Sequence, residues 1–120
     1  EAICAYPGVK HVNVYGVAVP AAEGAAGMAA LVTEGDLDLA HFRSYLAARL
    51  PAYARPLFLR MRAEIEVTGT FKYSKSDLKR DGYNPAIVAD RIYFDSQEQR
   101  AFVPLDRFLY QRIQNAQIRL

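Results

Sequence analysis

The first third of the chain carries two apolar runs that predict a pair of β-strands. Residues 9–19 form the first, in which the valines fall into two groups separated by a one-residue slip at Gly16. A glycine at such a slip is typical of a β-bulge or of a close backbone approach. Residues 28–33 form the second run, and the small-residue turn between the two predicts antiparallel pairing. Val12 and Val14 precede the slip, and Val17 and Val19 follow it.

A helical spacing of apolar residues follows these strands. Asp38 is a suitable N-cap for a helix that runs to about Leu50, where Pro51 ends it. Residues 1–6 resemble the last turns of another helix, closed by Pro7-Gly8. The apolar stripe of the helix that Asp38 caps consists of Leu39, Phe42, Tyr45, Leu46 and Leu50.

The second half of the chain continues with short elements. Residues 57–61 mix apolar and basic side chains and predict a third strand. Ser74 is a candidate cap for a short helix through Arg80, and Gly82 ends it.

The tail predicts a hairpin and a final helix. Residues 92–94 and 101–104 form the hairpin around a polar turn, and an amphipathic helix starts near Leu105. Its apolar residues are Leu105, Phe108, Leu109, Ile113 and Ile118. The pattern predicts an α+β fold in which a small, three-stranded, mostly antiparallel sheet packs with helices, plus a C-terminal hairpin and helix. A sheet of three strands is expected to bury one good face.

Composition limits the chemistry that the chain offers. A length of 120 residues, with 52% hydrophobic and 23% charged, is typical of one globular domain. Cys4 is the single cysteine, which excludes an intrachain disulfide and a cysteine-based zinc site and favours a reducing compartment. We expect it to be a small buried hydrophobe. His11 and His41 are too few for a metal site, no apolar run is long enough to span a membrane, and no phosphate-binding P-loop or nucleophile elbow occurs.

Positive charge is concentrated in the middle of the chain, although the formal net charge is only +2. Between residues 55 and 80 the basic side chains outnumber the acidic ones. The residues alone leave two interpretations open, a solvated face with intrachain ion pairs or a surface that faces phosphate. The basic residues are Arg55, Arg60, Arg62, Lys72, Lys75, Lys79 and Arg80, and the acidic ones are Glu64, Glu66 and Asp77.

Within this segment, Lys72 follows a Thr68-Gly69-Thr70 turn. A lysine on a turn can carry its ammonium into a neighbouring cleft and meet a carboxylate or a phosphate there, although many such lysines are simply solvated. Tyr53 and Arg55 lie between two prolines, which restrict the backbone. Arg55 is therefore a candidate phosphate ligand or a partner for a nearby carboxylate.

The motifs of the chain resemble a known family over nearly its whole length. The segments LPAYARPLFLR and IEVTGTFKYSKSDLKRDGYNPAIV are similar to the C-terminal domain of the adenylate-forming acyl-CoA synthetases. The opening YPGVKHVNVYGVAVPAAEGAAGMAALV and the tail segments IYFD and FVPLD resemble the fatty acid transport protein and very-long-chain acyl-CoA synthetase branch. Other branches usually place glycine directly before the lysine, whereas Phe71 stands there in this chain, as it does in this branch.

The resemblance implies an activity that this chain shares with a larger protein. Such enzymes use ATP and Mg²⁺ to convert a carboxylic acid to an acyl-adenylate, release pyrophosphate and pass the acyl group to the thiol of CoA. A large N-terminal domain holds Mg²⁺ and most of the ATP and acyl contacts. The small C-terminal domain rotates between the two half-reactions and supplies a lysine to the first, which is Lys72 by its place in the motif.

The resemblance also implies domain boundaries and further site residues. Residues 1–85 correspond to the common C-terminal domain and residues 86–120 to an extension of this branch; the N-terminal domain is absent, so we expect the isolated chain to be inactive. The turn with Tyr53 and Arg55 lies where relatives contact CoA, and a bulge at Tyr15 and Gly16 would line the thiol tunnel.

The expected partners are the protein's own N-terminal domain, a fatty acid and CoA, in the cytoplasm, with no nucleic acid. Peripheral contact with a membrane remains open. Two alternatives remain as well. One is a ligase for another carboxylic acid, and the other is a basic module that binds nucleic acid or an anionic membrane.

Overall fold

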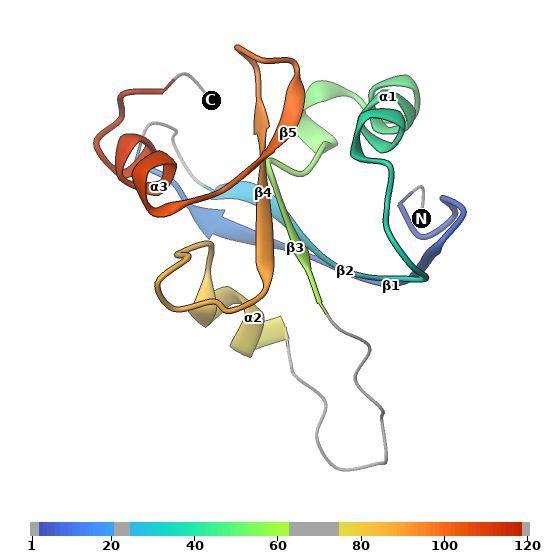
Figure 1. Cartoon of the computed structure of the whole chain (residues 1–120), viewed down its shortest axis with the longest axis horizontal. Helices are drawn as coiled ribbons and strands as arrows, with labels where there is room; N and C mark the ends of the chain where they lie inside the picture. The colour runs from blue at the N-terminus through green and yellow to red at the C-terminus, as the bar shows by residue number, and fades with distance from the viewer. Residues whose placement is uncertain (1–2, 21–24, 63–74, 119–120) are drawn as a thin grey trace.

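One mixed sheet of five strands organises the chain (Figure 1). The computed structural model describes residues 3–20, 25–62 and 75–118. The strand order is β1-β2-β3-β4-β5; β2 and β3 run parallel, and all other neighbours are antiparallel. The strands are β1 (Val9–Ala18), β2 (Ala25–Thr33), β3 (Phe58–Met61), β4 (Arg91–Ser96) and β5 (Ala101–Pro104).

The expectation of a three-stranded sheet with a separate C-terminal hairpin is corrected by this topology. The hairpin forms as predicted, but β4 pairs with the edge of β3, with Phe58 opposite Phe94. Local apolar spacing predicts a hairpin; it does not say which distant strand edge the hairpin will cover. The α+β class is confirmed, and the sheet is larger than the pattern indicated.

Within the described residues, three helices and a short 3₁₀ turn surround the sheet. They are α1 (Leu39–Arg49), η1 (Ala52–Ala54), α2 (Lys75–Asp81) and α3 (Arg107–Gln114). The predicted cap of α1 is confirmed, because the Asp38 carboxylate accepts a hydrogen bond from the His41 backbone N–H at 3.1 Å. Gly82 adopts a φ of +61° directly after α2, a conformation that suits glycine at a helix end.

The start of the described chain differs from its prediction. Residues 3–8 form turns rather than a helix, with backbone hydrogen bonds that span three residues. Tyr6 N donates to Ile3 O at 3.2 Å, and Val9 N donates to Tyr6 O at 3.1 Å. Gly8, at a φ of +95°, then turns the chain into β1. Cys4 is exposed on this segment, so the expectation that it is buried was wrong.

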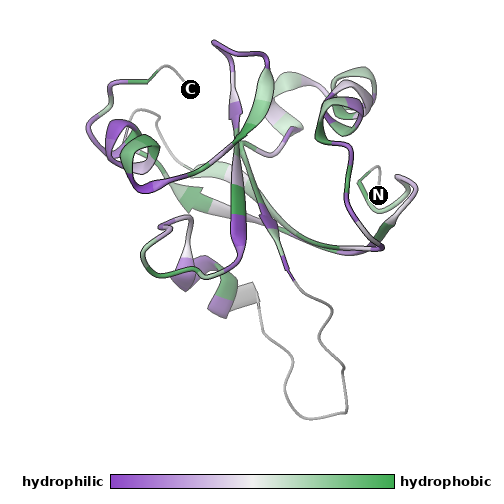
Figure 2. Cartoon of the chain, viewed as in Figure 1, coloured by the Kyte–Doolittle hydropathy of each residue, from purple (hydrophilic) through white to green (hydrophobic). Residues whose placement is uncertain are grey.

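Both faces of the sheet are covered, which corrects the expectation of one buried face. Figure 1 shows α1 and the N-terminal turns on one side and α2 and α3 on the other, and Figure 2 shows largely apolar strands between them. The core under α2 and α3 includes Phe58, Leu78 and Ile113, all fully buried. The core under α1 includes Phe42 and Leu59, which are also fully buried.

Gly16 does not mark a bulge. It pairs in regular register with Gly27, and the register shift of β1 lies between Val9 and His11. A Cβ at Gly16 would lie 3.0 Å from the Cβ of Ala25, which is closer than side chains normally approach. Close packing against the neighbouring strand therefore explains the glycine.

The final helix contributes less to the core than its pattern predicts. Leu105 and Ile113 are buried, but Phe108 is 71% exposed. Asp106 caps the start of α3, because its carboxylate accepts a hydrogen bond from Leu109 N at 2.8 Å. No helix in the part of the chain that the structure describes combines the length and apolar character needed to cross a membrane.

Two phenylalanines provide a matched test of this packing. Phe58 is fully buried and stacks on Tyr83 at 4.2 Å between ring centroids, whereas Phe108 faces solvent. We expect Phe58→Ala to lower the free energy of unfolding by about 3–5 kcal/mol, because it leaves a cavity in the core. Phe108→Ala should change it by no more than about 0.5 kcal/mol. Urea denaturation of the 120-residue chain measures both, and equal effects would contradict the packing described.

Candidate functional site

The lysine that the sequence singles out lies outside the described residues. Lys72 belongs to the connection 63–74, between the end of β3 and the start of α2. The structure does describe the elements on both sides of this connection. The candidate site is therefore built from the groups that fix β3 and α2 relative to each other.

Arg60 is the central group of this arrangement. Alternation along β3 places it two residues after Phe58, on the sheet face that α2 covers, and only 6% of the residue is exposed. Its Nε donates to Asp90 Oδ2 at 2.8 Å, and its Nη1 donates to Asp81 Oδ2 at 3.1 Å. Asp81 is the last residue of α2, and Asp90 directly precedes β4. One guanidinium thus joins three separate elements.

Electrostatics keep this arginine charged in the core. Burial by itself would lower the pKa of Arg60, but the hydrogen bonds to Asp90 and Asp81 outweigh it and raise the pKa above its usual value. A buried guanidinium needs such partners, because an unpaired charge in the interior is strongly unfavourable. The positions of the two carboxylates are therefore coupled to that of the arginine.

Neighbouring charges extend the cluster toward the surface. Arg62 Nε lies 4.0 Å from Asp90 Oδ2, and Arg80 Nε lies 3.8 Å from Asp81 Oδ1. The side chain of Arg80 is 69% exposed, so its pairs are expected to stabilise the fold only weakly. The buried pair of Arg60 with Asp81 joins β3 to α2.

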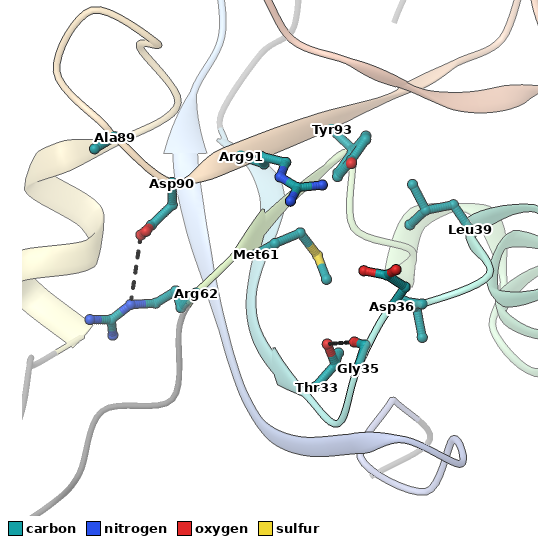
Figure 3. Close-up of a pocket in the computed structure, with 11 residues that line it drawn as sticks. Thr33, Gly35, Asp36, Leu39, Met61, Arg62, Ala89, Asp90, Arg91 and Tyr93 are labelled. Atoms are coloured by element: carbon teal, nitrogen blue, oxygen red, sulfur yellow. Dashed lines mark hydrogen bonds and ion pairs between the residues drawn. The ribbon is translucent and has the colours of Figure 1, made fainter.

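A cavity of about 550 Å³ opens where β3 ends (Figure 3). It lies on the α1 side of the sheet, with Met61 and Tyr93 in its wall. Figure 3 shows Arg91 and Asp36 on opposite sides of this space. Its lining mixes positive and negative groups and suits polar contacts better than an acyl chain. The cavity is lined by Thr33, Gly35, Asp36, Leu37, Leu39, Met61, Arg62, Ala89, Asp90, Arg91 and Tyr93.

Tyr53 and Arg55 share a second groove, of about 610 Å³. Tyr53 lies on η1 and is 92% exposed, so its ring is available to a ligand. Arg55 donates from Nε to Leu50 O at 2.9 Å and from Nη2 to Ala47 O at 3.2 Å. It therefore satisfies carbonyls at the C-terminal end of α1, a contact that neither the phosphate nor the carboxylate interpretation anticipated.

Tyr15 and Gly16 lie outside the groove that Tyr53 and Arg55 share. Tyr15 is only 4% exposed and belongs to the core under α2 and α3. Gly16 lines a separate groove of about 310 Å³, together with Tyr83 and residues of α2 and α3. The structure does not bring Tyr15 and Gly16 into the groove that Tyr53 and Arg55 line.

The basic segment is largely used for internal contacts. Its four arginines all bind carboxylates or backbone carbonyls of the same chain, which supports the interpretation of intrachain pairing over a continuous basic face. No group of three or more metal-binding side chains is found within residues 3–20, 25–62 and 75–118. The Nδ1 atom of His41 lies 2.5 Å from the hydroxyl oxygen of Tyr6. The four arginines are Arg55, Arg60, Arg62 and Arg80.

Sequence reasoning missed Asp81 and Asp90 as partners of Arg60. The available signal was Arg60 itself, a charge within an otherwise apolar strand, which requires a carboxylate nearby. Which of the aspartates would supply it depends on the packing of α2 and β4 against β3. The sequence pattern does not give that packing.

Comparison with known proteins identifies the class of domain. A family model of the AMP-binding enzyme C-terminal domain matches residues 1–72, more than half of the chain. The chain therefore belongs to the AMP-binding enzyme C-terminal domain family, as the motifs of its sequence predicted.

Within this family, the chain is similar to curated long-chain fatty acid transport proteins. The chain is 39% identical over 114 residues to long-chain fatty acid transport protein 6 of Mus musculus, covering 93% of the chain and 18% of the relative. It is 44% identical over 107 residues to long-chain fatty acid transport protein 1 of Mus musculus, covering 88% and 17%. The chain thus spans less than a fifth of the length of these relatives. No solved structure matches it significantly.

A double-mutant cycle tests the strength of the Arg60 cluster. We expect Arg60→Met and Asp81→Asn to show a coupling free energy of about 1–3 kcal/mol, because either change alone leaves a buried partner unsatisfied. The cycle of Arg80→Met with Asp77→Asn, a pair at 3.1 Å whose arginine is largely exposed, should give less than about 1 kcal/mol. Urea denaturation of all variants measures both couplings, and the reverse order would contradict the role of Arg60.

Proposed function

We propose that this chain is the mobile C-terminal domain of a long- or very-long-chain fatty acid:CoA ligase, and that it supplies Lys72 to adenylate formation. The observation that carries the proposal is the family match over residues 1–72, together with similarity to long-chain fatty acid transport proteins over most of the chain. The match ends at Lys72, so the candidate lysine lies within the part that the family shares.

The proposed chemistry of the first half-reaction requires a cation at a defined point. A fatty acid carboxylate attacks the α-phosphorus of ATP, and pyrophosphate leaves as the acyl-adenylate forms. Negative charge gathers on the phosphate and carboxylate oxygens in the transition state. The ammonium of Lys72, removed from water between these oxygens, stabilises that charge and holds the two reactants in line.

The second half-reaction is proposed to use another face of the domain. The thiol of CoA attacks the acyl carbonyl, AMP leaves, and the thioester forms. Tyr53 is the candidate contact for CoA, because its exposed ring lies at a groove and can stack on a base or pack against pantetheine. Arg55 is proposed to act by holding the turn to the end of α1 rather than by binding phosphate.

The remaining partners are assigned to the rest of the enzyme. An N-terminal domain is proposed to hold the acyl pocket and most contacts to ATP, and residues 86–120 are proposed to be an extension of this branch. Mg²⁺ bound in that domain would neutralise charge on the phosphates. We propose a cytoplasmic active site, with peripheral contact to a membrane as a separate property of the whole protein.

The two alternatives are weaker on different grounds. A ligase for another carboxylic acid would share this domain and its lysine, and the relatives' names favour long-chain fatty acids. A module for nucleic acid or anionic membrane would need a basic surface, but the four arginines of the central segment make contacts within the chain. Substrate profiling of the full-length enzyme separates the first alternative from our proposal.

Replacing the candidate lysine tests the proposal directly. In the full-length ligase, we expect Lys72→Ala to lower the rate of acyl-adenylate formation by about a hundredfold or more, because it removes a charge that stabilises the transition state. Thioester formation from supplied acyl-adenylate should keep most of its rate. Pyrophosphate release and single-turnover thioester formation measure the two steps separately.

A second lysine provides the control for this experiment. Lys79 is exposed on α2, seven residues further along the same basic segment. Lys79→Ala should leave both half-reactions unchanged. Equal loss of both half-reactions in Lys72→Ala would contradict the role proposed for this lysine.

The role of Tyr53 is tested by its affinity for CoA. Tyr53→Ala should raise the KM for CoA by about tenfold, since base stacking contributes on the order of 1–3 kcal/mol, and it should leave adenylate formation unaffected. The side chain of Tyr53 is exposed and can be removed without loss of packing, whereas removing Arg55 would also break its hydrogen bond to Leu50 O. Phe108→Ala, another exposed aromatic, is the control. An unchanged KM in Tyr53→Ala would exclude the contact.

A further inference from the structure

We infer that Arg60 is a positioning residue for adenylate formation, acting by fixing α2, the helix that follows the catalytic connection. The inference rests on the proposed function, because it assumes that Lys72 works in the first half-reaction. It adds a role for a buried arginine and two aspartates that neither the family match nor the relatives' names assign.

One contact links the strand before the catalytic connection to the far end of the helix after it. β3 ends at Met61, one residue after Arg60, and the described structure resumes at the start of α2. Arg60 Nη1 holds the last residue of α2, Asp81, at 3.1 Å. The same guanidinium therefore belongs to the strand before the connection and binds the helix after it.

A second contact fixes the direction of the guanidinium. Arg60 Nε binds Asp90 Oδ2 at 2.8 Å, and Asp90 directly precedes β4, which pairs with β3. The side chains of Arg60, Asp81 and Asp90 are 8%, 16% and 28% exposed, so water competes little for the inner contacts. An arginine fork held at two points has little freedom, and it restrains Asp81 accordingly.

The position of α2 limits where Lys72 can reach. Lys72 is three residues before Lys75, the first residue of α2, and three residues of chain span at most about 11 Å. Because α2 has seven residues and packs through the fully buried Leu78, a tilt at Asp81 shifts the whole helix. A displacement of about 1 Å at a reacting group can lower a rate by about a hundredfold.

Asp81→Asn in the full-length ligase is the informative variant. It keeps the shape of the side chain and weakens the contact to Arg60, so we expect adenylate formation to slow by about tenfold to a hundredfold. Thioester formation from supplied acyl-adenylate should stay within about twofold, because that step does not use Lys72 in the proposed mechanism. Asp81→Glu, which retains a carboxylate, should restore most of the adenylation rate.

Two controls separate positioning from general stability. Asp77→Asn makes the same chemical change one turn earlier in α2, where the aspartate pairs with the exposed Arg80, and it should leave both half-reactions unchanged. Ile113→Ala removes a fully buried side chain of α3 that bonds to neither aspartate. Partial unfolding caused by this variant should lower both half-reactions to the same extent.

The outcomes distinguish the two proposals. Selective loss of adenylation in both Asp81→Asn and Lys72→Ala supports the positioning role. If Lys72→Ala is selective but Asp81→Asn lowers both steps equally, as Ile113→Ala does, or lowers neither, the positioning role is wrong and the proposed function stands. If Lys72→Ala is not selective, the proposed function itself fails.

Discussion

The buried guanidinium of Arg60 is the constraint on which the arrangement of this domain depends. It lies in the middle strand of the sheet, among fully buried apolar neighbours such as Phe58 and Leu59, and it meets carboxylates from two other elements. A buried ion pair adds less stability than its Coulomb energy suggests, since both charges lose their hydration. Its stronger effect here is geometric, because the guanidinium of Arg60 in β3 binds both Asp81 of α2 and Asp90 just before β4.

A second ion pair makes the corresponding connection on the other face. Arg43 of α1 binds Asp95 of β4 at 2.8 Å, and Asp95 is 7% exposed. Each face of the sheet therefore has one helix held to a strand by an arginine and an aspartate. The Arg43 pair and the Arg60 pair lie next to different parts of the molecule. The Arg43 pair lies close to the groove with Tyr53, whereas the Arg60 pair flanks the connection that contains Lys72.

Much of the fold was predictable because its local signals are strong. Asp38 and Pro51 define α1, and Gly82 ends α2, since capping and backbone constraints act within a few residues. The pairing of β3 with β4 joins residues 30 or more positions apart, and no local pattern encodes it. For the same reason a three-stranded sheet was expected, and one buried face instead of two.

In the candidate site, too, local motifs could be recognised in the sequence, whereas contacts between distant segments could not. Lys72 could be proposed as a candidate because its motif is continuous in the sequence and resembles that of a known family. The contacts of Arg55 with the carbonyls of Ala47 and Leu50 were not predicted, because those carbonyls are available only at the end of a helix. Arg60 was counted as one surface charge among several, and its role depends on where Asp81 and Asp90 lie in space.

Amide hydrogen exchange on the Arg60→Met variant tests most directly whether this side chain holds α2 in place. If it does, the amides at the end of α2, such as Gly82 N bonded to Leu78 O, should lose protection strongly, while those of α1 change little. A uniform loss of protection in α1 and α2, or an unchanged α2, would contradict the account.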